Sequence, residues 1–141
     1  MIFGYTTGVF DMFHIGHLRV LERSKAECDQ LIVGITTDEL SLEEKGKRPI
    51  VPFAERRQIV SALRCVDLTV PQTSMDKLAA WESLRFDRMF VGSDWKGTDR
   101  WNDLERAFAA IGVEIIYFSY TDSTSSSQLR SALTLLHGDE S

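Results

Sequence analysis

The sequence predicts an α/β fold in which a parallel five-stranded sheet lies between two layers of helices. Short apolar segments alternate with longer amphipathic segments, and this alternation occurs five times along the 141 residues. The apolar segments, such as LIVGI and VEIIYF, are nearly continuous, which is typical of strands buried on both faces. Polar motifs follow the first, fourth and fifth of them. Because ligands of such folds bind beyond the carboxyl ends of the strands, these motifs should meet at one edge of the sheet.

The first helix should follow a glycine-containing turn, and Leu18 and Leu21 place an apolar face on it. Pro52 provides a rigid start for the second helix, in which Phe53 and Val60 share one side. A hydroxyl-rich segment precedes the amphipathic run QLRSALTLL, which predicts the last helix. The strands are expected at 2–6, 31–36, 68–70, 88–91 and 113–118, and the helices near 15–27, 53–64, 75–84, 101–111 and 126–136. Residues 1–136 are predicted to form a single domain, with 137–141 as a frayed tail.

Composition excludes several classes of protein. A net charge of −5 argues against a general nucleic-acid binder, although a few basic residues in one cleft can still bind a small anion. Cys28 and Cys65 are far apart without a CxxC spacing, which favours buried thiols of a reducing compartment over a disulfide. No run of 18 apolar residues occurs, so no membrane span is predicted. We therefore expect a cytoplasmic protein that does not bind membranes.

The stretch GVFDMFHIGH, residues 8–17, is the most informative motif. It follows the first strand and opens a helix, where free backbone N–H groups and the helix dipole favour an anion. Gly16 lacks a Cβ, so a phosphate can approach the backbone closely. His14 and His17 are three residues apart and can reach one ligand. Two other interpretations remain: a metal site formed by Asp11 and the two histidines, and a purely structural pair.

The same stretch resembles the GxFDxxHxGH signature of the cytidylyltransferase-like nucleotidyltransferases. Six fixed positions are present within ten residues, namely Gly8, Phe10, Asp11, His14, Gly16 and His17. The length and motif spacing are most similar to the small bacterial glycerol-3-phosphate cytidylyltransferases. This resemblance implies a Rossmann-like fold of the nucleotidyltransferase type with the HIGH-type motif. It also implies transfer of CMP from CTP to a phosphorylated alcohol, first choice glycerol 3-phosphate, with release of pyrophosphate and formation of CDP-glycerol.

The resemblance further implies roles for individual residues. His14 and His17 would stabilise charge on the triphosphate during direct in-line displacement, assisted by Lys47, and Lys45 and Lys47 would bind the acceptor. The residues expected to bind the nucleotide are Thr7, Gly8, Val9, Phe10, Asp11, Gly16, Arg56, Arg64, Asp94, Thr121, Ser125 and Ser126. Mg²⁺ would be carried by the nucleotide, as is common for this ion, so no protein metal site is predicted. A homodimer is expected by resemblance alone.

The last motif, SYTDSTSSS, departs from the family pattern RTxGIS[ST]T. Tyr120 stands where the family has an arginine, and Ser123 and Thr124 replace a Gly-Ile pair. Loss of one charge-assisted hydrogen bond weakens binding by about ten- to a hundredfold unless another cation compensates. The motif therefore leaves the identity of the acceptor substrate open. The alternatives are an adenylyltransferase, a cytidylyltransferase for another phosphorylated molecule, and a non-catalytic nucleotide-binding regulatory module.

Overall fold

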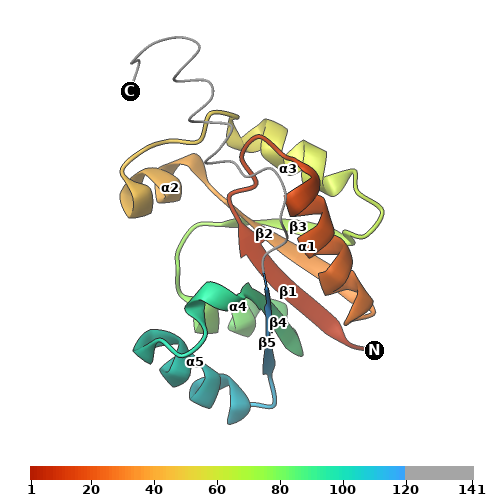
Figure 1. Ribbon diagram of the computed structural model, residues 1–141, viewed down its shortest axis with the longest axis vertical. Coiled ribbons are helices and arrows are strands. Elements are labelled where there is room, and N and C mark those ends of the chain that lie inside the picture. Colours follow the sequence, from red (N-terminus) through yellow and green to blue (C-terminus); the bar gives the residue numbers. More distant parts are fainter. Residues whose placement is uncertain (120–141) are drawn as a thin grey trace.

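A parallel sheet of five strands, ordered β3-β2-β1-β4-β5, forms the centre of the computed structural model, which describes residues 1–119 (Figure 1). The strands are β1 (Phe3–Gly8), β2 (Gln30–Thr36), β3 (Leu68–Gln72), β4 (Arg88–Gly92) and β5 (Glu114–Phe118). Every neighbouring pair is parallel. The predicted three-layer α/β fold of the Rossmann-like type is confirmed. The sequence pattern also located each strand to within two residues at either end.

Helices cover both faces of the sheet. They are α1 (Ile15–Ala26), α2 (Asp38–Lys45), α3 (Phe53–Ser61), α4 (Lys77–Leu84) and α5 (Asp99–Ala109), with a short 3₁₀ turn, η1 (Ser93–Trp95), after β4. Figure 1 shows α1 and α3 on one side of the sheet and α4 and α5 on the other. None of the helices in this described part combines the length and apolar character needed to cross a membrane. The helix expected near 126–136 lies outside the described residues.

Helix α2 was missed, because no helix was expected between residues 36 and 53. Thr37 caps its N-terminus by accepting a hydrogen bond from the Leu40 amide at 3.1 Å. Gly46 ends it in the left-handed region at φ 76°, with its N–H bonded to the Leu42 carbonyl. The eight-residue helix buries only Leu40 and Ser41, so its apolar periodicity is too weak to stand out in the sequence.

Two hydrophobic clusters fill the spaces between the layers. Leu21 of α1 and Val60 of α3 pack on one face of β1 and β2, with Phe10 and Phe90. On the opposite face, side chains of α5 pack against the strand residues that point to that side. This second cluster includes Tyr5, Ile32, Met89, Trp101 and Phe108. The chain moves outward from β1 to β3, then returns to β4 on the other side of β1. The reversal places the topological switch point at the carboxyl ends of β1 and β4, where such folds bind ligands.

Candidate active site

The loop that joins β1 to α1 carries the GVFDMFHIGH motif and has an unusual backbone. Phe10 and Met12 both lie in the left-handed region, with φ of 56° and 49°. Such conformations are costly for residues other than glycine and persist only where surrounding contacts hold them. The buried ring of Phe10 provides one such contact, because it packs in the cluster beneath α1 and α3. This packing helps to hold the loop in its left-handed conformation.

The two histidines form the N-terminal cap of α1. His14 is the cap residue, and its Nδ1 accepts a hydrogen bond from the Gly16 amide at 3.0 Å. The Nδ1 of His17 accepts in turn from the His14 amide at 3.2 Å. This is the reciprocal arrangement of a capping box, with imidazoles in place of the usual hydroxyl and carboxylate. The rings stack with centroids 4.0 Å apart.

This arrangement fixes the protonation state of both rings. Because each Nδ1 accepts a backbone hydrogen bond, a neutral ring must carry its proton on Nε2. Burial lowers the pKa of His14. Burial also lowers the pKa of His17 to about 4; the neighbouring His14 adds to the effect and Asp11 opposes it. Near neutral pH both side chains thus offer an Nε2–H donor, and neither has a free nitrogen to act as a base.

Asp11 joins the motif to the segment that leads into α3. It is only 3% exposed. Its two carboxylate oxygens accept hydrogen bonds from the amides of Ile50 and Val51, both at 2.9 Å. In this geometry the Asp11 carboxylate and the Nδ1 atoms of both histidines bond to backbone amides. In residues 1–119 no group of three or more acidic, histidine or cysteine side chains is placed to hold a metal ion.

Arg56 of α3 lies beneath the motif with 1% of its surface exposed. Its guanidinium donates to the carbonyls of Val9, Thr36 and Val51 at 2.7, 2.8 and 2.8 Å, and to Oδ1 of Asp38 at 2.6 Å. Four of its five N–H groups are therefore bonded to the protein. Arg56 was predicted to bind the nucleotide; the structure gives it a framework role, holding together the segments that follow β1 and β2.

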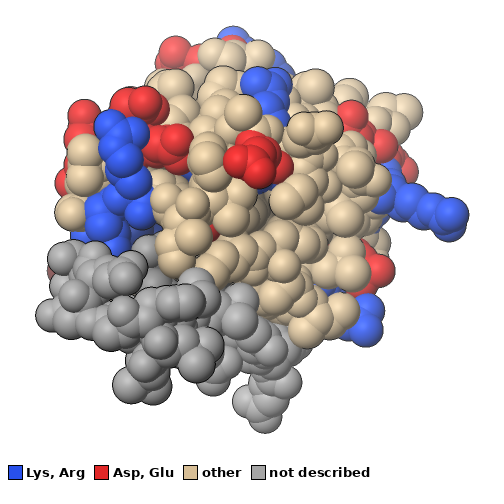
Figure 2. Space-filling view, turned by 90° about the horizontal axis from the view of Figure 1, so that it is seen from above, with Lys and Arg blue, Asp and Glu red and all other residues tan. Residues whose placement is uncertain are grey.

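The basic residues predicted for the acceptor and the triphosphate are on the surface. Lys45 ends α2, and Lys47 follows Gly46 in the loop; both are exposed. Arg64 is exposed after α3. On the face seen in Figure 2, lysine and arginine side chains stand among acidic and uncharged ones, so its described part carries no continuous basic surface.

The remaining predicted residues follow the strands as expected, or lie outside the described part. Thr7, Gly8 and Val9 run from the carboxyl end of β1 into the motif, with Gly16 in the first turn of α1. A Cβ on Gly8 would come within 2.9 Å of the Phe10 ring, so this position requires glycine for packing. Asp94 is exposed in η1, beyond β4. Thr121, Ser125 and Ser126 lie outside the described residues, as does Tyr120.

Sequence reasoning missed one residue beside the motif. Lys77, the first residue of α4, is buried, and its Nζ donates to Oγ1 of Thr7 at 3.1 Å. No sequence signal identifies it, because its partner is 70 residues away. The capping role of the histidines had a signal: their spacing equals that of the cap and third residues of a capping box.

Comparison with known proteins places this geometry in a family. A family model described as cytidylyltransferase-like matches residues 5–132. The glycerol-3-phosphate cytidylyltransferase of Bacillus spizizenii is 33% identical over 132 residues, which cover 93% of this chain and 96% of that protein. The bifunctional protein HldE of Granulibacter bethesdensis is 37% identical over 97 residues, 68% of this chain but only 20% of HldE.

Among solved structures, a lipopolysaccharide core biosynthesis protein from Thermoplasma volcanium has a TM-score of 0.72 at 27% identity, covering 88% of this chain and 99% of that one. Pantoate-beta-alanine ligase from Francisella tularensis has a TM-score of 0.65 at 14% identity, covering 93% and 68%, and so shares the fold. The matched family, the complete GVFDMFHIGH motif and the capped histidine pair agree: this chain belongs to the cytidylyltransferase-like family of nucleotidyltransferases.

Proposed function

We propose that the protein transfers CMP from CTP to a phosphorylated alcohol, with glycerol 3-phosphate as the first-choice acceptor, giving CDP-glycerol and pyrophosphate. The observation that carries the proposal is the pair of imidazoles at the N-terminus of α1, held as neutral Nε2–H donors by backbone bonds to their Nδ1 atoms. Likeness to named glycerol-3-phosphate cytidylyltransferases at 30–33% identity over most of the chain supports the choice of acceptor.

The reaction needs charge stabilisation rather than a base. An oxygen of the acceptor phosphate attacks the α-phosphorus of CTP and forms a new P–O bond. The bond from the α-phosphorus to the oxygen bridging to the β-phosphate breaks, and pyrophosphate leaves. The acceptor oxygen is already ionised near neutral pH, so no proton has to be removed from it. His14 and His17 donate Nε2–H hydrogen bonds to phosphate oxygens, and the helix terminus adds its dipole.

Mg²⁺, carried by the triphosphate, would neutralise part of its charge. The exposed Lys45, at the end of α2, and Lys47, in the loop that follows, approach the acceptor and the triphosphate. Arg64, Asp94, Thr121, Ser125 and Ser126 complete the nucleotide site, and Thr7, Gly8, Val9, Phe10, Asp11 and Gly16 shape its floor. The homodimer stays a prediction, which sedimentation equilibrium checks.

A second candidate is nucleotidyl transfer to a sugar phosphate. The observation that favours it is the 37% identity to HldE over 97 residues, higher than the identity to the glycerol-3-phosphate enzymes. Because a fold does not determine its substrate, the decision depends on the acceptor pocket.

The test is an assay of pyrophosphate release with Mg²⁺, each of CTP and ATP, and a panel of acceptors. The panel contains glycerol 3-phosphate, phosphocholine, phosphoethanolamine and glucose 1-phosphate. We expect the highest kcat/KM for CTP with glycerol 3-phosphate. Turnover with ATP but not with CTP would refute CTP as the nucleotide substrate. A preference for glucose 1-phosphate would favour the second candidate. Tight CTP binding without turnover would indicate a regulatory module.

A further inference from the structure

The loop 46–52 joins α2 to α3 and carries the exposed Lys47 (Figure 1). Gly46 turns the chain at the end of α2 with a φ of 76°. After this turn the backbone of Lys47 lies against α2, where the hydroxyl of Ser41 donates a hydrogen bond to the Lys47 carbonyl at 3.2 Å. The backbone of Lys47 is therefore bonded to the helix, while the residue as a whole is exposed.

Ser41 is unusual for a serine inside a helix. It is 3% exposed and is one of the two residues that α2 buries. A serine within a helix commonly bonds back to the carbonyl four residues earlier. Ser24 of α1 does so, because its Oγ donates to the Val20 carbonyl at 2.8 Å. The Ser41 hydroxyl instead reaches six residues forward, out of its own helix and onto the loop.

A purely structural role explains this serine poorly. Alanine has a higher helix propensity than serine, and at a buried position it would bring no polar group that needs a partner. The Lys47 carbonyl does not depend on the bond either, because it belongs to an exposed residue and water can reach it once the hydroxyl is removed. The hydroxyl therefore serves to fix where the loop lies.

The other end of the same loop is bonded to the histidine motif. The carboxylate of Asp11, which belongs to GVFDMFHIGH, accepts hydrogen bonds from the amides of Ile50 and Val51, both at 2.9 Å. Because Ile50 is three residues after Lys47, their Cα atoms are at most about 11 Å apart. Ser41 and Asp11 therefore hold the two ends of a short segment, and Lys47 lies close to the motif.

We propose that Ser41 is a positioning residue, whose hydroxyl holds the backbone of Lys47 so that the ammonium extends from a fixed point beside the histidine motif. The proposal rests on the proposed function for the role of Lys47. A fixed backbone restricts the space that the long side chain can search, so the ammonium is near the triphosphate for more of the time.

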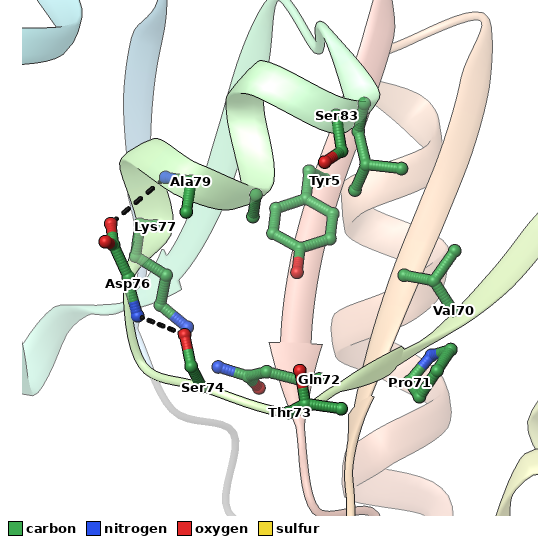
Figure 3. Close-up of a pocket in the computed structure, with 12 residues that line it drawn as sticks. Tyr5, Val70, Pro71, Gln72, Thr73, Ser74, Asp76, Lys77, Ala79 and Ser83 are labelled. Atoms are coloured by element: carbon green, nitrogen blue, oxygen red, sulfur yellow. Dashed lines mark hydrogen bonds between the residues drawn. The ribbon is translucent and has the colours of Figure 1, made fainter.

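A change at Ser41 leaves the neighbouring cavity as it is. This cavity of about 380 Å³ lies between the end of β3 and α4, and Figure 3 shows the residues around it. The described residues that line it belong neither to α2 nor to the loop 46–52. An effect of Ser41 on turnover is therefore expected to pass through the loop.

The test is a double-mutant cycle of Ser41→Ala and Lys47→Met, with Ser24→Ala as the matched control. Ser24 is also buried in a helix, but its hydroxyl bonds to its own helix. With the substrate pair that turns over best, we expect Ser41→Ala to lower kcat/KM about three- to tenfold, the effect of one neutral hydrogen bond, and Ser24→Ala to match wild type. When Lys47→Met is already present, adding Ser41→Ala should change kcat/KM by less than about 1.5-fold.

Two results would overturn the proposal. The first is an unchanged kcat/KM for Ser41→Ala. The second is the same fold-loss with and without the Lys47 ammonium, because a general disturbance of the fold persists when the ammonium is gone, whereas a positioning effect does not. Thermal midpoints of Ser41→Ala and Ser24→Ala, which we expect to be similar, show whether the two variants lose the same amount of structure.

Limited digestion with trypsin tests the anchor without the reaction. Trypsin cuts after Lys45 and Lys47, whereas Pro49 blocks the cut before it. Because cleavage follows the population of the open loop, Ser41→Ala should raise the rate at these two bonds about three- to tenfold, and Ser24→Ala should not. Faster cleavage with no turnover for any substrate pair would mean that the anchor stands and the reaction is wrong. Unchanged cleavage refutes the anchor whatever the activity.

Discussion

Replacing Arg56 by methionine should destabilise the protein more than any other single change to an arginine in the described part. The methionine keeps an unbranched apolar stem near the Phe53 ring, and it removes four hydrogen bonds of 2.6–2.8 Å. Three carbonyls, those of Val9, Thr36 and Val51, lose their donor. The Asp38 carboxylate loses its cation, although its side chain is 23% exposed and can be hydrated in part.

The magnitude follows from these contacts. Hydrogen bonds to charged groups contribute about 1.5–3 kcal/mol each, and removing one partner of a buried ion pair costs about 3–5 kcal/mol. Because Asp38 can be partly hydrated and the contributions overlap, we expect a loss of about 3–5 kcal/mol rather than the sum. For a chain of this size that lowers Tm by roughly 10–20 °C. Arg56→Lys keeps the charge without the planar fork, and should lose about 2 kcal/mol.

Urea denaturation followed by far-ultraviolet circular dichroism measures this free energy. The matched control is Arg64→Met, an exposed arginine of the same region that makes no hydrogen bond or ion pair within the described residues. It should change the free energy of unfolding by less than about 0.5 kcal/mol. A loss below about 1 kcal/mol for Arg56→Met would refute the framework role.

Three further predictions concern the motif and the sheet. His14→Asn and His17→Gln each keep an acceptor for the helix cap but remove the Nε2–H donor. Each should lower kcat for pyrophosphate release by about 10²–10³, with less than about 1 kcal/mol lost in urea unfolding. Unchanged rates would refute the catalytic role of the histidines. Because folding lowers the pKa of His17 from 6.5 to about 4, the unfolded chain binds more protons between these values. Stability should therefore fall as pH drops from 6.5 to 4, and urea midpoints of His17→Gln should show a shallower fall; equal slopes would contradict the pKa. Gly4→Ala would place a Cβ 2.5 Å from the Phe90 ring and 2.7 Å from Cys28 Sγ, so calorimetric melting should show a loss of about 1–3 kcal/mol, and an unchanged Tm would mean that the sheet can shift to accommodate it.

The sequence determined the features that depend on neighbours along the chain. Alternating apolar and amphipathic segments gave the order of strands and helices in residues 1–119 except α2, whose eight residues bury too little apolar surface to be recognised. The GVFDMFHIGH motif located the site, because a strand end, a glycine turn and a helix start lie within ten residues. The family followed from that motif and agrees with the model that matches residues 5–132.

Only the tertiary structure decided what the polar side chains contact. In the sequence, Arg56 looks like an ordinary helical arginine. The strand order brings the segments at the ends of β1 and β2 over it, and the carbonyls of Val9 and Thr36 accept hydrogen bonds from its guanidinium. Asp11 reads as a ligand and bonds to amides 39 and 40 residues away. Lys77 is buried because the return from β3 to β4 lays the start of α4 against β1. Periodicity carries information over a few residues, whereas burial and hydrogen-bond partners depend on which distant strands lie side by side.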